Sequence, residues 1–345
     1  MSIVDSPRLV VGGVDTHLDT HVAAVVDRNG GLLGVERFAA TAAGHAALSS
    51  WMTGFGTLER VGIEGTGAYG IGLSRHFRSL EMPVVEIDRP NRQQRRRNGK
   101  SDELDAVEAA RGALSGRCSG VAKSGDGPVE ALRALMVVKR SARSNRIRTL
   151  VQLRYLMFTA PDELRARFTG HTPAHLANEA ARLRPSGDTV MHATKTAAVA
   201  LARRVHALDA EIAAVDQQIE PIVTAAGPRL LDIYGCGIDT AAILLVTAGD
   251  NADRIRDEAA WAMLCGLAPI PANSGRRDGR YRLNSGGNRQ ANHAHYRIVL
   301  TRLGQREQRT VAYMNRRLEQ GLAKPEIIRC LKRYVARETF VALPR

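Results

Sequence analysis

Four acidic residues stand where secondary-structure elements are expected to begin or end. Asp15 and Glu64 each close an apolar run that is expected to be a strand. Asp102 and Asp105 open an expected helix at i,i+3 spacing, which puts both carboxylates on one face. Carboxylates that converge from strand ends and a helix start are the ligands that Mg²⁺ or Mn²⁺ needs for phosphodiester chemistry. Two such ions can stabilise the attacking and the leaving oxygen together.

Each of these acids also has a simpler reading when it is taken alone. Asp15 could be a polar strand end, Glu64 a surface acid, Asp102 a first-turn helix acid and Asp105 the ion-pair partner of an arginine. Their order along the chain, together with the phase of the strands and the helix, favours the joint reading as a metal site.

The elements around these acids predict an α/β fold with a mixed sheet. Apolar runs at 8–16, 22–27 and 32–38 are separated by short turns, one of them Asn29-Gly30-Gly31. An all-parallel sheet would not begin with two hairpins, whereas helices and strands alternate further along the chain. These later elements are expected at 41–53 (helix), 59–63 (strand), 68–80 (helix), 83–87 (strand) and 101–114 (helix).

After a Gly- and Ser-rich break at 115–128, the chain becomes helical. Residues 129–158 predict a helix with a basic face, and residues 198–222 carry apolar side chains alternately four and three apart, which is a heptad seam. The two helices predict an antiparallel hairpin, a dimerising coiled-coil arm or an ordinary helical bundle. The expected domains are 1–125 (α/β), 126–225 (helical connection) and 226–345 (mostly α).

The charge of the chain favours a polyanionic partner. The sequence has 49 Lys+Arg against 35 Asp+Glu, a formal net charge of +14, and phosphates neutralised by such cations release condensed counterions. Solubility charge or a place on the ribosome would also account for this excess. The residues expected to contact nucleic acid are Arg92, Arg95, Arg96, Arg97, Lys139, Arg140, Arg143, Arg276, Arg277, Arg280, Arg282 and Arg289.

Several of these arginines lie in a segment rich in Gly, Asn and Arg, residues 261–297. Such a cluster suits a phosphate backbone, and Tyr281 and Tyr296 could add base stacking. A solvated basic loop is the alternative. Ser274 stands in this segment beside a glycine.

Three stretches resemble the DEDD domain of the IS110/IS1111-family transposases. They are Gly13-Val14-Asp15-Thr16-His17, Gly62-Ile63-Glu64-Gly65-Thr66-Gly67-Ala68-Tyr69 and Lys100-Ser101-Asp102-Glu103-Leu104-Asp105-Ala106. The resemblance implies a fold similar to RNase H and to RuvC junction resolvases, with Asp15, Glu64, Asp102 and Asp105 binding the metal ions. Ser101 stands where this block often has threonine, a change without expected effect on the chemistry.

Residues 261–297 resemble the C-terminal transposase domain of the same family. The resemblance implies that Ser274 is a nucleophile that holds a DNA end as a phosphoserine ester, and it disfavours the rival Ser285. An ester of this kind conserves the energy of the broken bond for rejoining. The family also implies donor and target DNA, a non-coding guide RNA, and a dimer or tetramer in which the serine of one protomer can meet the metal site of another.

Other classes of protein remain open at this stage. A RuvC-like hydrolytic junction nuclease would share the carboxylates without needing Ser274. An actin-like or sugar-kinase ATPase would need a second glycine-rich phosphate loop, and a nucleic-acid scaffold would need no convergence of the acids. The four scattered cysteines form no C-x-x-C pair, and no long apolar stretch predicts a membrane span. A reduced cytoplasmic location near the bacterial nucleoid is therefore expected.

Overall fold

The computed structural model describes residues 8–87, 101–116, 120–271, 281–284 and 286–344. The chain forms two compact units. The first contains the described residues up to Asp126 together with Ala248–Arg256, and the second contains Gly127–Thr247 and Asp257–Pro344.

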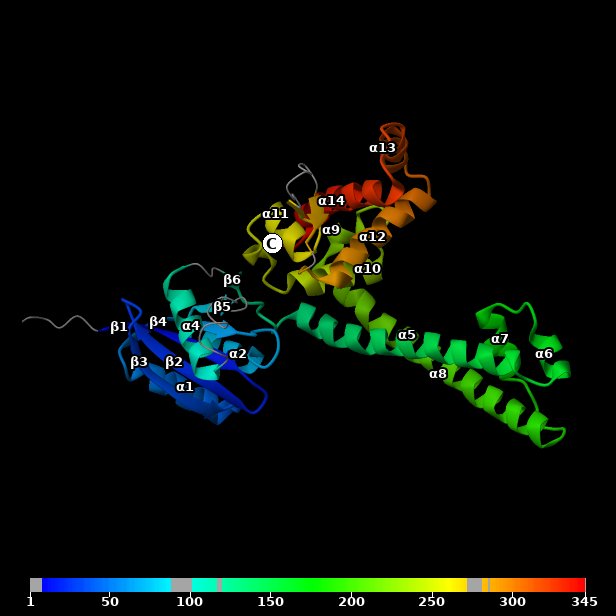
Figure 1. Cartoon of the computed structure of the whole chain (residues 1–345), viewed down its shortest axis with the longest axis horizontal. Helices are drawn as coiled ribbons and strands as arrows, with labels where there is room; N and C mark the ends of the chain where they lie inside the picture. The colour runs from blue at the N-terminus through cyan, green and yellow to red at the C-terminus, as the bar shows by residue number, and fades with distance from the viewer. Residues whose placement is uncertain (1–7, 88–100, 117–119, 272–280, 285, 345) are drawn as a thin grey trace, which may run out of the picture. The chain divides into compact units, whose positions relative to one another are not determined.

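A six-stranded mixed sheet forms the centre of the first unit (Figure 1). The strand order is β3-β2-β1-β4-β5-β6, with β1 antiparallel to β2 and parallel to β4. The predicted α/β fold with a mixed sheet is therefore confirmed. The strands are β1 (Leu9–Thr16), β2 (Thr20–Asp27), β3 (Leu32–Ala39), β4 (Thr57–Glu64), β5 (Val84–Ile87) and β6 (Gly120–Val121).

Helices α1 (Ala42–Thr53), α2 (Ile71–Ser79) and α4 (Asp102–Leu114) belong to this unit. Thr41 caps α1 by accepting from the Gly44 amide, as expected for a threonine directly before a helix. The helix expected at 68–80 begins at Ile71 instead. The chain before it turns through Gly65, whose φ of +76° suits glycine and not a helix.

Two parts of the first unit were not expected from the sequence. The break predicted at 115–128 contains the short strand β6, and Ala248–Arg256 packs beside it although it comes much later in the chain. Asn251 makes this attachment: its side chain donates to the Ala122 carbonyl at 2.9 Å and accepts from the Ser124 amide at 3.0 Å.

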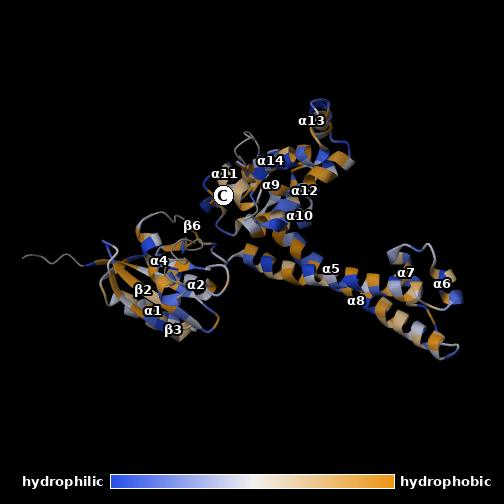
Figure 2. Cartoon of the chain, in the orientation of Figure 1, coloured by the Kyte–Doolittle hydropathy of each residue, from blue (hydrophilic) through white to orange (hydrophobic). Residues whose placement is uncertain are grey.

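The second unit contains a pair of long helices, α5 (Pro128–Phe158) and α8 (Thr189–Ala226), with the short helices α6 (Asp162–Phe168) and α7 (Pro173–Ala180) between them in sequence. The ion pairs Arg146–Asp209 and Lys139–Asp216 show that α5 and α8 run antiparallel. Both helices alternate between apolar and polar residues along their length (Figure 2).

The heptad seam of 198–222 lies on α8, where Val205, Val215 and Ile219 are buried. Since α8 packs along α5, much of this seam is used within the chain.

The remaining helices of the second unit include the one that carries the buried Trp261. They are α9 (Pro228–Leu231), α10 (Ile238–Ala248), α11 (Glu258–Leu264), α12 (Arg289–Gly304), α13 (Gln308–Glu319) and α14 (Lys324–Ala342). A hairpin of β7 (Pro269–Pro271) and β8 (Tyr281–Leu283) completes it. Across the described part of the chain, no helix combines the length and the hydrophobicity that crossing a bilayer requires.

Candidate metal centre

Two glycines let helix α4 lie directly on the sheet. A Cβ atom at Gly13 of β1 would come within 3.0 Å of the Ala110 nitrogen and the Ala106 oxygen of α4. A Cβ at Gly62 of β4 would come equally close to the Ala109 oxygen. A larger residue at either position would therefore push the helix away from the strands. This close packing fixes the start of α4 relative to the ends of β1 and β4.

The strand register places Asp15 and Glu64 on the face that α4 covers. Gly13 pairs with Gly62 across the parallel strands β1 and β4, and side chains two residues further along a strand point to the same face. Asp15 and Glu64 each follow their glycine by two residues, at the carboxyl ends of neighbouring strands. The Thr16 hydroxyl ties these ends together by donating to the Glu64 carbonyl at 2.7 Å.

Helix α4 brings the other two acids. Ser101 occupies the N-cap position without a side-chain cap bond, and Asp102 and Asp105 follow in the first turn. Asp105 is 5% exposed and Asp15 is 7% exposed. Burial of a carboxylate costs free energy unless a cation or hydrogen bonds compensate it.

Asp15, His17 and Asp102 form a group that could hold a metal ion. Each offers one ligand atom, and these atoms all lie within 4.8 Å of one another. His17 lies between the two acids: its Nδ1 is 3.7 Å from Asp15 Oδ2, and its Nε2 is 3.8 Å from Asp102 Oδ1. Arg37 of β3 approaches from outside, with Nη2 4.0 Å from Asp102 Oδ2.

The structure thus brings Asp15 and Asp102 together directly, places Glu64 beside Asp15 by register, and places Asp105 one turn after Asp102.

His17 was not among the residues selected from the sequence. Its only signal there is its position two residues after Asp15, in the turn between β1 and β2. Two carboxylates and an imidazole are a reasonable donor set for a divalent cation, since Mn²⁺ accepts nitrogen more readily than Mg²⁺ does.

Three histidines cluster on the opposite face of the same sheet, and His21 among them is fully buried. His21 of β2 stacks on His45 of α1 with ring centroids 5.3 Å apart, and His76 Nε2 lies 2.9 Å from Ser49 Oγ. Burial lowers the pKa of His21 to about 4, and the neighbouring His45 lowers it further. This cluster is separate from the acidic group, because His21 pairs with Thr16 and not with Asp15.

Three basic residues expected to contact nucleic acid are engaged inside the second unit. Lys139 is 4% exposed, and its ammonium group is paired with Asp216 and Asp239. The Arg143 Nη1 donates to Asp239 Oδ2 at 2.8 Å, and Arg140 donates to the Gln290 side chain. Lys139 is therefore part of the interior of this structure and is not presented to a nucleic acid.

Two other predicted contacts, Arg282 of β8 and Arg289 at the start of α12, are exposed. The remaining predicted site residues lie outside the described residues. These are Arg92, Arg95, Arg96, Arg97, Ser274, Arg276, Arg277 and Arg280.

Comparison with known protein families agrees with this geometry. A family model described as "Transposase", for the DEDD domain of IS110 elements, matches residues 12–160, which include all four acids. A second model, described as "Transposase IS116/IS110/IS902 family", matches residues 227–315. No individual curated protein gave a match. The two matches follow one another in sequence order and together span most of the chain. The chain belongs to the IS110 family of transposases.

Proposed function

We propose that this chain cleaves and rejoins the DNA strands of an insertion sequence, using Mg²⁺ or Mn²⁺ held by Asp15, Glu64, Asp102 and Asp105. The observation that carries the proposal is the convergence of Asp15 and Asp102, within 4.8 Å, from elements far apart in sequence. Like charges at this distance repel one another, and a cation between them relieves the repulsion. A bound divalent ion would stabilise negative charge on the phosphate as strands are cut and joined.

His17 is a further candidate for holding the ion or for orienting the acids. Its two ring nitrogens face Asp15 and Asp102. A neutral imidazole in this position could offer one nitrogen to a cation while the other ring N–H donates to a carboxylate. This arrangement would shift the preference of the site toward Mn²⁺ relative to a site made of carboxylates alone.

Ser274 is proposed as the nucleophile on the basis of the family resemblance. Its Oγ would attack the scissile phosphorus and form a phosphoserine ester, while the bond to the departing DNA oxygen breaks and that oxygen leaves as a hydroxyl after gaining a proton. A hydroxyl of another strand would then attack the same phosphorus and release the serine, so the number of phosphodiester bonds is conserved.

The partners proposed with this activity are donor DNA, target DNA and a non-coding guide RNA, in a bacterial cytoplasm near the nucleoid. The RNA follows from the resemblance alone. Exposed arginines such as Arg282 and Arg289 suit either nucleic acid, since both are bound through phosphates.

A homo-oligomer, dimer or tetramer, is also proposed. An apolar stripe on the outer face of α5, made of Ile147, Val151, Tyr155 and Phe158, is 48–71% exposed. Its spacing of four, four and three residues is that of a helix–helix seam. Since α8 already covers another face of α5, a second copy is the partner proposed for this stripe. Val151→Asp should then lower the mass of the oligomer measured by analytical ultracentrifugation. An unchanged mass would show that the stripe is not an interface between copies of the chain.

The experiment that tests the activity looks for a covalent protein–DNA adduct. The substrate is a labelled duplex carrying an end of the element, supplied with RNA transcribed from its flank. The wild-type chain should give an adduct that survives denaturing electrophoresis, whereas Ser274→Ala should give none and still bind the DNA. Ser285→Ala is the matched control and should keep the adduct, and Asp15→Asn should lose cleavage altogether.

The second candidate function, a hydrolytic junction nuclease, predicts a different outcome. Cleavage would need Asp15 but not Ser274, and the wild-type chain would form no adduct. Cleavage that continues in Ser274→Ala would therefore contradict the serine mechanism and leave the metal site in place.

A further inference from the structure

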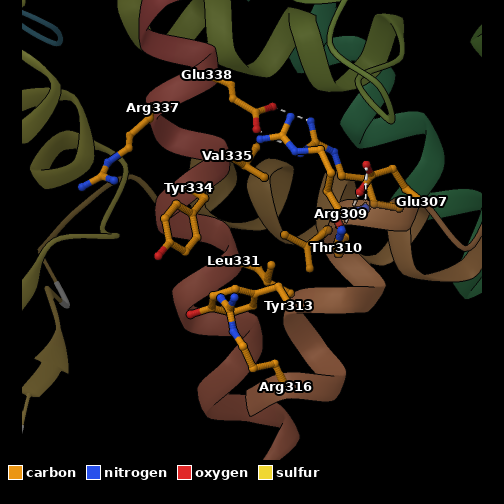
Figure 3. Close-up of a pocket in the computed structure, with 12 residues that line it drawn as sticks. Glu307, Arg309, Thr310, Tyr313, Arg316, Leu331, Tyr334, Val335, Arg337 and Glu338 are labelled. Carbon is orange, nitrogen blue, oxygen red and sulfur yellow. Dashed lines mark hydrogen bonds and ion pairs between the residues drawn. The ribbon is translucent and has the colours of Figure 1, made fainter. Parts of the chain in front are cut away.

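A groove on the second unit lies outside the acidic site. Two hollows of about 420 and 540 Å³ share Tyr313, Tyr334 and Arg337, so they adjoin one another, and together they are called the groove. Helices α13 and α14 contribute to both hollows, α12 to the first, and the β7–β8 hairpin to the second. In Figure 3, Tyr334 and Arg337 extend from α14 while Tyr313 and Arg316 extend from α13.

The groove is strongly cationic. Eight arginines and three glutamates line the two hollows. The glutamates already have structural partners: Glu307 accepts from the Thr310 amide, Glu326 accepts from the Ala323 amide, and Glu338 is paired with Arg302. Within the described part of the chain, no ion pair engages Arg282 or Arg329. A groove with this excess of guanidinium groups attracts phosphates.

Aromatic rings line the same groove. Tyr313 and Tyr334 meet edge to face with centroids 5.4 Å apart, and Tyr334 is 46% exposed. The Arg337 guanidinium lies over the Tyr334 ring at 5.5 Å, and Tyr281 at the hairpin is 63% exposed. Rings and guanidinium planes stack on unpaired bases while neighbouring arginines hold the phosphates. A duplex keeps its bases stacked inside and would use the arginines alone.

The groove also adjoins the hairpin that carries the candidate nucleophile. Strands β7 and β8 pair from Pro269–Leu283 to Pro271–Tyr281. Ser274 belongs to the segment that joins these two strands, and Tyr281, Arg282 and Leu283 of β8 line the groove.

We propose that this groove binds an unpaired segment of the DNA strand being exchanged, with bases stacked on Tyr334 and Tyr281 and phosphates held by arginines such as Arg329. The proposal rests on the proposed function, since only strand cleavage and exchange would present unpaired DNA beside the hairpin.

The test measures DNA binding without chemistry. The full chain is kept free of divalent metal, and fluorescence anisotropy follows a labelled single-stranded oligothymidine and an abasic strand of equal length. Tyr334→Ala should weaken binding of oligothymidine about tenfold and leave binding of the abasic strand nearly unchanged. Tyr334→Phe, which keeps the ring, should bind like the wild type. Arg329→Gln should weaken both and reduce the slope of log affinity against log salt by about 0.7.

Tyr234→Ala is the matched control, because Tyr234 is 50% exposed, close to the exposure of Tyr334, and lines a different hollow. Equal losses for the two strands in Tyr334→Ala, or an equal loss in Tyr234→Ala, would overturn the proposal. Stronger binding of single-stranded RNA than of DNA through Tyr334 would overturn the assignment to DNA. These binding measurements do not depend on the covalent adduct. A negative result for the groove can therefore be told apart from a negative result for the serine mechanism.

Discussion

Both units bury charged side chains, but they do so in different ways. In the second unit Lys139 is buried against Asp216 and Asp239, so opposite charges meet. In the first unit two acids are buried, Asp15 and Asp105, and ligand atoms of Asp15 and Asp102 lie within 4.8 Å of each other. A buried pair of opposite charges is a structural contact. Carboxylates that come this close repel one another, and a metal ion between them would relieve the repulsion. The difference separates residues that hold the fold from residues that are expected to work on a substrate.

The largest expected effect on stability comes from a substitution that separates α4 from the sheet. Gly13→Ala should lower the free energy of unfolding by about 3 kcal/mol, because the added methyl meets backbone atoms of α4 that cannot rotate away. It should also weaken metal binding, since Asp102 would move away from Asp15. Chemical denaturation and a Mn²⁺ titration measure the two effects.

Gly67→Ala is the control for this change. A Cβ there has no atom within 4 Å, so stability should change by less than about 0.5 kcal/mol. If Gly13→Ala behaved like Gly67→Ala, the close contact between α4 and β1 would not be what positions the acids.

A smaller loss of stability is expected when the buried charge of Lys139 is removed from the second unit. Lys139→Met should lower the free energy of unfolding by about 2 kcal/mol, less than the roughly 3–5 kcal/mol of a fully sealed pair, because the side chains of Asp216 and Asp239 are 45% and 29% exposed. The exposed Arg203 on α8 offers the control Arg203→Met, which should have little effect on stability. Duplex DNA binding by the folded Lys139→Met protein should match the wild type. Retained stability with lost DNA binding would restore Lys139 to the nucleic-acid surface.

The last effect concerns pH, and near pH 7 it is the smallest, because both histidines concerned are then largely neutral in the folded and in the unfolded chain. Burial lowers the pKa of His21 in the first unit and of His295 in the second to about 4, against 6.5 for an unperturbed histidine. Between these values the unfolded chain binds more protons than the folded chain, so stability is complete above about pH 6.5 and falls as the pH drops toward 4. The slope should be at most about 1.4 kcal/mol per pH unit for each histidine.

The two tryptophans allow each unit to be followed alone. Trp51 lies in α1 of the first unit and Trp261 in α11 of the second, beside His295. In a Trp51→Phe background, Trp261 fluorescence should show the acid-sensitive slope, and His295→Gln should flatten it. An unchanged slope in that variant would assign the acid sensitivity to other groups.

The sequence predicted the sheet, and the positions of Asp15 and Glu64 near the ends of their strands, for a physical reason. Buried strands are continuous apolar runs, and Asp15 and Glu64 interrupt them abruptly where each strand ends. Helix α4 was equally clear, because acids fill its first turn after Ser101. Such signals are local and can be recognised without the fold.

Contacts between distant segments could not be predicted in the same way. The basic residues of α5 suggested an exposed face, but Lys139 finds Asp239 one hundred residues later. Strand β6 has two residues, and Asn251 binds Ala122 and Ser124 directly after it from more than 120 residues away. His17 was passed over because a single histidine in a turn has no periodic pattern, and only the fold places it between Asp15 and Asp102.

The central claim is that Asp15 and Asp102 hold a divalent cation, and Mn²⁺ binding to the full chain tests it most directly. Electron paramagnetic resonance of free Mn²⁺ should show one or two ions bound per chain in the wild type. Asp15→Asn and Asp102→Asn should each weaken binding at least about tenfold. Asp162→Asn, on the exposed surface of α6, should not change it. Wild-type Mn²⁺ binding in both site variants would contradict the account.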